Sequence, residues 1–137
     1  SPKRVSVGLD QNRLSLQLAI LHKHSGISTF DQDVFINVVG GIKVSETASD
    51  LVVMLAIVSS LRDKVIPNNW IAFGEVGLTG EVRPVYNAME RLSEAQKQGF
   101  EVAIIPKGNA PKKSIKGLKI VTVGYLYQAI QYLLENS

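Results

Sequence analysis

A run of eight apolar residues, from Leu51 to Val58, constrains the fold of this chain more than any other feature. The run lies inside a longer segment, 46–61, whose composition predicts a helix that Thr47 can cap. A helix that is apolar almost all round cannot lie on a surface, because it needs cover on every side. Eight residues are also far fewer than the roughly 18 that a membrane span requires. We therefore expect a buried helix covered by β-sheet.

Short strands and helices alternate along the rest of the chain. Strands are expected at 4–9, 33–39, 70–73, 82–85, 102–105 and 120–123, and helices at 88–98 and 125–134. The apolar period of segment 12–23 suits either a helix or a strand. A turn-rich bridge with three glycines occupies residues 74–81. The predicted fold class is α/β (α+β), with one domain over residues 1–137 that has a mixed β-sheet and flanking helices.

The composition excludes several classes of protein. Hydrophobic residues make up 45% of the 137 residues and charged residues 20%, which is typical of a globular domain and not of a disordered chain. The chain has no cysteine, so it has neither a disulfide nor a zinc–thiolate site. The two histidines, His22 and His24, have no acidic or cysteine partner at ligand spacing, and no metal site is expected. These features predict a cytoplasmic protein without a membrane partner. The opening at Ser1, with no initiator Met, suggests a piece of a longer protein.

Positive charge is concentrated at the two ends of the sequence. Residues 1–23 hold four basic residues and one acid, residues 24–105 hold six and ten, and residues 106–137 hold five and one. The segment 106–119 reads as a flexible loop with five lysines and no acid. Such a loop is either a solvated surface or a contact for a polyanion, because ammonium groups displace counterions from phosphates.

Three segments together resemble the proteolytic domain of Lon proteases. They are a helix start at 47–50, a glycine-rich stretch at 73–85 and a second helix start at 88–92. In that family a serine is the nucleophile and a lysine is its base. These two positions fall on Ala48 and Met89, which offer a methyl group and a thioether. Ser49 is displaced from the serine position by one helical step, roughly 5 Å. The resemblance therefore implies the fold without its catalytic residues, and the chain is expected to hydrolyse nothing.

A more specific resemblance rests on four longer blocks, at 7–14, 33–43, 46–51 and 73–84. Their order and spacing are similar to the C-terminal Lon-like domain of the bacterial RadA (Sms) family, over residues 4–135. The resemblance implies a ribosomal-protein-S5-domain-2-like fold, a hexameric ring and sequence-independent binding of single-stranded or branched DNA during branch migration in DNA repair. It places ATP, Mg and Zn in a RecA-like ATPase and a zinc finger that this sequence lacks. Contact with the RecA recombinase would come through the full-length protein.

The same resemblance makes the basic residues candidate DNA contacts. These candidates are Lys3, Arg4, Arg13, Lys43, Arg83, Lys112, Lys113 and Lys116. Lys43 and Arg83 have a competing interpretation as structural ion-pair partners, because glutamates lie near both in the sequence. Two other functions stay open. One is a working Lon-type serine protease that uses Ser49 as a displaced nucleophile. The other is an RNA-binding module, because the Lon-like fold shares a βαβ arrangement with certain ribosomal proteins.

Overall fold

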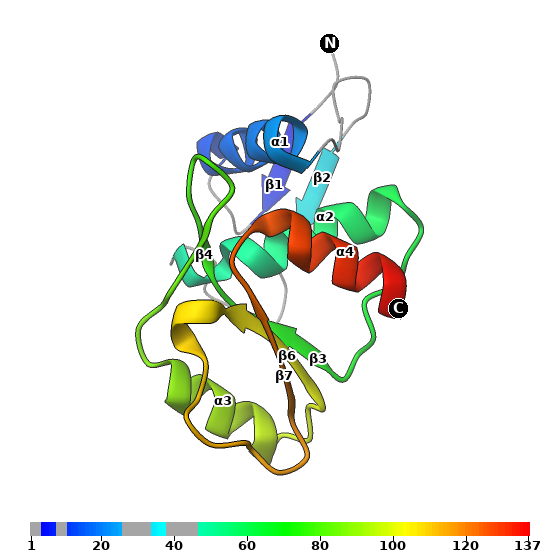
Figure 1. Cartoon of the computed structure of the whole chain (residues 1–137). Coiled ribbons are helices and arrows are strands. Elements are labelled where there is room, and N and C mark those ends of the chain that lie inside the picture. The colour runs from blue at the N-terminus through cyan, green and yellow to red at the C-terminus, as the bar shows by residue number, and fades with distance from the viewer. Residues whose placement is uncertain (1–3, 8–10, 26–33, 38–46) are drawn as a thin grey trace.

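A computed structural model of the chain describes residues 4–7, 11–25, 34–37 and 47–137 (Figure 1). The helices are α1 (Gln11–Ser25), α2 (Asp50–Leu61), α3 (Ala88–Lys97) and α4 (Leu126–Asn136), with short 3-10 turns η1 (Thr47–Ser49) and η2 (Lys107–Asn109). The strands are β1 (Arg4–Val7), β2 (Val34–Asn37), β3 (Trp70–Ala72), β4 (Glu75–Val76), β5 (Val82–Arg83), β6 (Val102–Pro106) and β7 (Lys119–Val123). Helices alternate with both parallel and antiparallel strands, which confirms the predicted α/β class.

The described strands form three groups. β3, β6 and β7 make a parallel sheet with β6 in the centre, in a register that pairs Val102 with Lys119 and Pro106 with Val123. β1 and β2 pair in parallel, and β4 and β5 form an antiparallel hairpin. The central strand β6 alternates its side chains between the two faces of the sheet, as strand geometry requires. Ile104 therefore packs in one hydrophobic cluster, whereas Ala103 and Ile105 pack in the other.

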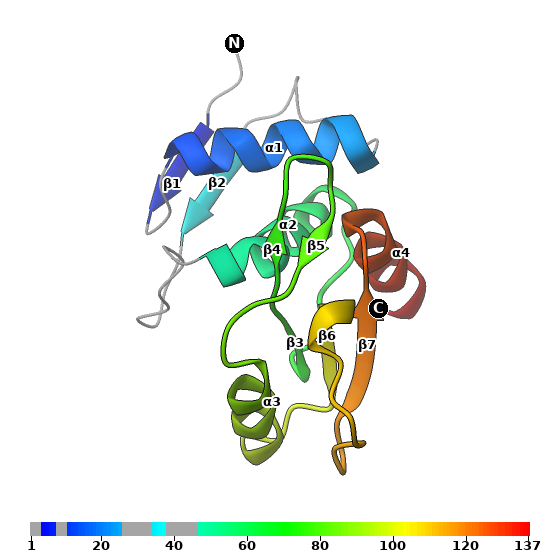
Figure 2. The ribbon, with the colours of Figure 1, turned by 60° about the vertical axis from the view of Figure 1, so that its left-hand side comes forward.

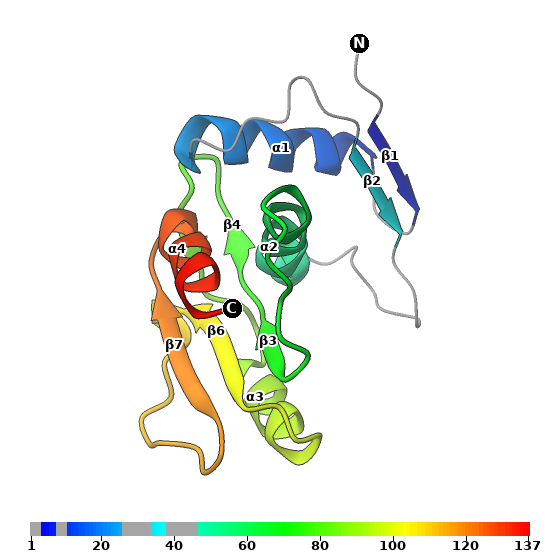
Figure 3. The same ribbon diagram turned by 90° about the vertical axis from the view of Figure 1, so that its right-hand side faces the viewer.

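Helix α2 lies at the centre of the molecule, as the apolar run predicts. Figure 3 shows α2 with α1 above it, α4 beside it and the three-stranded sheet below. Leu51, Met54 and Val58 of α2 are fully buried against apolar side chains of α1, α4 and the sheet. On the opposite face of the sheet, α3 buries Leu92 against Phe73 and β6. The sheet is thus covered on both faces, which is the layered arrangement typical of α/β domains.

The glycine-rich bridge contains strand β4, which the sequence did not predict and which pairs with β5 in a hairpin. Figure 2 shows the hairpin passing α2 with its tip against α1. At this contact a methyl group built on Gly80 would lie only 3.1 Å from Cβ of His24, so a larger residue would crowd α1. The φ of Gly80 is +81°, a backbone conformation that also favours glycine. The strand expected at 82–85 ends at Arg83, because Pro84 has no N–H to continue a ladder.

The start of α2 differs from the expectation. The segment 47–49 forms the 3-10 turn η1, and the residue at the N-cap of α2 is Ser49. The predicted cap at Thr47 is therefore wrong, and the side chain of Thr47 instead lowers the pKa of Glu75 in the hairpin. Segment 12–23, whose period was ambiguous, is helical. Of the helices in the described ranges, none combines the length and the apolar character needed to cross a membrane.

Candidate functional site

The two positions that correspond to the Lon serine and lysine lie in different surroundings. Ala48 is buried in η1, and its carbonyl accepts a hydrogen bond from the N–H of Gly74 at 2.9 Å. Met89 is the second residue of α3, and its side chain is exposed. The residue at position 89 is 54% exposed to water, whereas a lysine that acts as a general base needs desolvation to lower its pKa.

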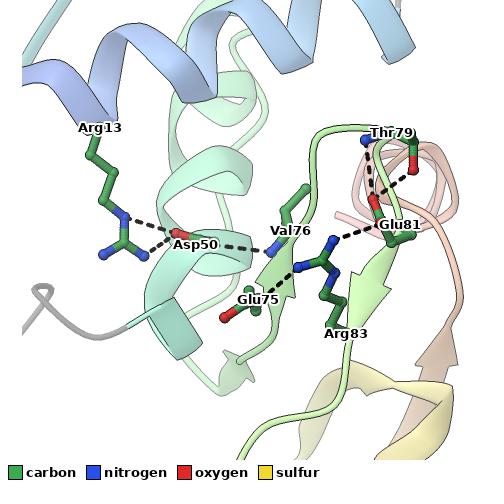
Figure 4. Close-up of polar contacts among 7 residues, drawn as sticks. All are labelled: Arg13, Asp50, Glu75, Val76, Thr79, Glu81 and Arg83. Atoms are coloured by element: carbon green, nitrogen blue, oxygen red, sulfur yellow. Dashed lines mark hydrogen bonds and ion pairs between the residues drawn. The ribbon is translucent and has the colours of Figure 1, made fainter.

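Asp50 is a buried carboxylate that joins three elements. Its Oδ1 accepts hydrogen bonds from Nε of Arg13 at 3.0 Å, from Nη2 of the same arginine and from Nε2 of Gln17 at 3.1 Å. Its Oδ2 accepts the N–H of Val76 at 3.1 Å. The side chains of Arg13 and Asp50 are only 18% and 9% exposed. Figure 4 shows this carboxylate of α2 between α1 and the hairpin. Arg13, a candidate DNA contact, is thus held in a structural ion pair.

Sequence reasoning missed Asp50. Its partners Arg13 and Val76 are 37 and 26 residues away along the chain, so no local spacing points to them. The available signal was a carboxylate directly before the apolar run. A charged residue in that place is either at the surface or paired, because an isolated charge in the interior is too costly.

Arg83 is the centre of a second network, at the surface. Its Nη1 donates to Oε1 of Glu75 at 3.2 Å and its Nη2 donates to Oε2 of Glu81 at 3.0 Å (Figure 4). These contacts confirm the ion-pair interpretation of Arg83, although its side chain is still 51% exposed. Whether Arg83 also contacts DNA stays a prediction.

Hydrogen bonding around this network shifts the acidity of its members. The pKa of Glu81 is lowered to about 2. The largest cause is the Thr79 hydroxyl, which donates to Oε1 of Glu81 at 2.7 Å, and the backbone N–H of Glu81 and the side chain of Arg83 lower this pKa further. The side chain of Thr47 and, to a smaller extent, Arg83 lower the pKa of Glu75, against an opposing effect of partial burial. The bonds to Glu81 and Glu75 raise the pKa of Arg83 in turn. All three groups are therefore charged at neutral pH.

The lysines of the basic loop are placed differently from these arginines. Lys112, Lys113 and Lys116 lie on the surface between η2 and β7, and none of them forms an ion pair with another described residue. The loop is anchored at two points. The Asn109 side chain accepts the N–H of Val85 at 2.8 Å and donates to the carbonyl of Val85 at 3.1 Å. Nε2 of Gln96 donates to the carbonyl of Lys116 at 2.7 Å. The lysines are thus presented to solvent by a loop that the rest of the fold holds.

The structure says less about the three remaining candidate DNA contacts. Lys3 and Lys43 lie outside the described residues, and Arg4 opens strand β1. Of the eight predicted contacts, the structure therefore gathers Lys112, Lys113 and Lys116 in one loop and assigns Arg13 and Arg83 to ion pairs. Within the described ranges, no group of three or more histidine, aspartate or glutamate residues is placed to hold a metal ion.

A comparison with known protein families shows to which family the chain belongs. The family described as subunit ChlI of Mg-chelatase matches residues 8–109. The chain belongs to this family. Among individual proteins, the DNA repair protein RadA of Pseudomonas aeruginosa is 58% identical over 135 residues, which is 98% of this chain and 30% of that protein. RadA of Escherichia coli is 55% identical over 130 residues, and RadA of Aquifex aeolicus is 47% identical over 133 residues. The predicted resemblance to RadA is thereby confirmed.

The extents of these matches separate two parts of the chain. The ChlI family match runs from before α1 to the end of η2 and stops at residue 109, ahead of the lysines at 112–116. The match to the Pseudomonas RadA covers 98% of the chain, so it includes the basic loop, β7 and most or all of α4. The chain spans about 30% of the length of the RadA relatives that it matches.

Proposed function

We propose that this chain is a non-proteolytic, Lon-like module of a RadA-type DNA repair protein in the cytoplasm, where it supports ring assembly and binds DNA without regard to sequence. The observation that carries the proposal is the 58% identity to a RadA protein along 98% of the chain. The ATP-driven step, with its Mg and Zn, is assigned to parts of the whole protein outside these 137 residues.

The chemistry of two positions supports the non-proteolytic part of the proposal. A serine–lysine mechanism needs a hydroxyl that attacks and a neutral amine that accepts its proton. The methyl group of Ala48 and the thioether of Met89 supply neither. We expect that the variant Ala48→Ser/Met89→Lys does not hydrolyse a fluorogenic peptide or casein, because a lysine at the exposed position 89 stays hydrated and protonated. An oxyanion hole would also be needed.

Two results would contradict this part of the account. One is robust peptide turnover by the double variant. The other is labelling of Ser49 in the unmodified chain by a fluorophosphonate, with loss of the label in Ser49→Ala. Either result would favour a working protease with a displaced nucleophile.

The basic loop is the surface that we assign to DNA. Its lysines are exposed, carry no described counter-charge and lie on an anchored loop, so their ammonium groups are available to phosphates. Arg13 and Arg83 contribute less in this proposal, because binding DNA would require them to share or give up their carboxylate partners. Lysine contacts to phosphate position the protein on the DNA backbone and carry no sequence information.

The charge-reversal variant Lys112→Glu/Lys113→Glu tests this assignment. We expect its affinity for a labelled branched DNA, measured by fluorescence anisotropy at low salt, to fall about tenfold or more, because two favourable phosphate contacts become repulsive. Circular dichroism and thermal melting should not change, since both side chains lie at the surface. The matched control is Arg62→Glu/Lys64→Glu, which alters the net charge equally at exposed positions after α2. Equal affinities of the two variants would place the DNA surface elsewhere.

A further inference from the structure

Two tyrosines form an exposed aromatic pair where β7 passes into α4. The rings of Tyr125 and Tyr127 stack with their centroids 6.0 Å apart and their planes inclined by 25°. Although the rings contact each other, the two residues remain 50% and 53% exposed. The pair therefore presents flat apolar surface to water, and nothing in the proposed function so far uses it.

The backbone around this pair is fixed by several hydrogen bonds. Oε1 of Gln128 accepts the N–H of Gly124 at 2.8 Å and the N–H of Tyr125 at 3.0 Å. The N–H of Leu126 donates to the carbonyl of Gly80 at 2.8 Å, which ties the start of α4 to the hairpin. Tyrosine has few rotatable bonds, so a ring on such a fixed backbone loses little entropy when it binds a partner. The backbone at the start of the pair is thus already ordered.

Lys107 lies next to Gly124, the residue that precedes the aromatic pair. The β6–β7 ladder pairs Pro106 with Val123, so the residues that follow, Lys107 and Gly124, are neighbours. A methyl group built on Gly124 would lie 3.6 Å from Cδ and 3.8 Å from Cε of Lys107. Lys107 is exposed, and no described carboxylate pairs with it.

The aromatic pair and the basic loop belong to one side of the molecule. Strand β7 is an outer strand of its sheet, and Figure 3 shows the basic loop at one end of this strand and the start of α4 at the other. Lys107 begins the loop at the tyrosine end, and the lysines at 112–116 continue it. A strand of DNA that follows this edge would meet ammonium groups along its path and aromatic rings at its end.

We propose that Tyr125 and Tyr127 form a stacking platform for the unpaired bases of single-stranded DNA, with Lys107 contacting the neighbouring phosphate. The inference rests on the proposed function and deepens it, because lysines alone would serve duplex and single strands alike. A flat aromatic surface with a lysine next to the residue that precedes it fits the repeat of base and phosphate in a single strand. Because the two rings are in contact, a base stacks on the outer face of the pair. Stacking accepts any base, which agrees with binding without regard to sequence.

The variant Tyr125→Leu/Tyr127→Leu, with Tyr125→Phe/Tyr127→Phe as its matched control, tests the platform. We expect the leucine variant of the 137-residue chain to bind an oligothymidine about fivefold or more weakly than the phenylalanine variant, since base–aromatic stacking is lost. Affinity for a duplex of equal length should change less than about twofold, because phosphate contacts remain. An abasic oligonucleotide with the same number of phosphates should bind both variants equally.

Each contrary outcome has its own meaning. If the leucine and phenylalanine variants bind oligothymidine equally while Lys112→Glu/Lys113→Glu weakens both DNA types, the platform is refuted and the proposed function stands. If the leucine variant loses self-association at unchanged DNA affinity, the pair is a protein contact and the platform is refuted as well. If the unmodified chain binds neither duplex nor single strand, the proposed function itself fails, and the platform fails with it.

Discussion

Replacement of Asp50 by alanine is expected to lower the free energy of unfolding by about 3 to 5 kcal/mol, the usual effect of removing one partner from a buried ion pair. The carboxylate accepts hydrogen bonds from Arg13, Gln17 and the N–H of Val76. Its removal takes the ion pair with Asp50 from a guanidinium that is only 18% exposed, and it takes the acceptor from the buried N–H of Val76. A small domain is stable by only about 5 to 15 kcal/mol, so the variant should be close to unfolding.

Urea unfolding followed by circular dichroism measures this change. The matched control is Arg83→Ala, which removes a guanidinium from the surface network with Glu75 and Glu81. Solvent screens that network, so we expect a much smaller change than for Asp50→Ala. Equal effects of the two variants would show that burial of the Arg13–Asp50 pair has no energetic consequence and would contradict the account.

Asp50 also connects the core to the proposed DNA surface. It holds the hairpin to α2 through the N–H of Val76, and the hairpin in turn holds the start of α4 through the carbonyl of Gly80. The tyrosine pair stands at that start. A loss of Asp50 should therefore loosen elements that are distant from α2 in the sequence.

The features that the sequence predicted correctly are those with a strong local signal. The apolar run at 51–58 required a buried helix, and most of α2 is buried, although Val52 and Ala56 on one side of it remain exposed. The helix expected at 88–98 is α3, and it ends before Gly99, which has a φ of +88°, while the N–H of the next residue, Phe100, donates back to the carbonyl of Ala95 at 3.0 Å. That arrangement is the usual glycine-terminated end of a helix. The resemblance to RadA was equally visible, because long blocks agree in order and spacing.

Features that depend on distant contacts could not be predicted. Strand β4 of the hairpin has only two residues, which is too short for an alternating pattern to appear, whereas β5 lies within the strand expected at 82–85. A list of basic residues does not tell which of them a carboxylate already binds, so the ion pair of Arg13 with Asp50 could not be foreseen. The exposure of Tyr125 and Tyr127 could not be predicted from the sequence either. The pattern at 125–134 indicated the apolar face of a helix and left its solvent face without an interpretation.

The affinity of the unmodified chain for duplex DNA should depend steeply on salt. The proposed surface offers the four lysines at 107, 112, 113 and 116 to phosphates. Each phosphate contact releases condensed counterions, so four contacts give a slope of log affinity against log salt of about −3.6. Between about 50 and about 200 mM salt the affinity is expected to fall roughly 150-fold.

A salt titration of DNA binding, followed by fluorescence anisotropy over this range, is the most direct test of the account. Binding with a slope of about −3.6 that becomes shallower by about two in Lys112→Glu/Lys113→Glu is the predicted result. A slope near zero, no binding at low salt, or the same slope in both proteins would contradict the claim that this chain is a module that binds the DNA backbone.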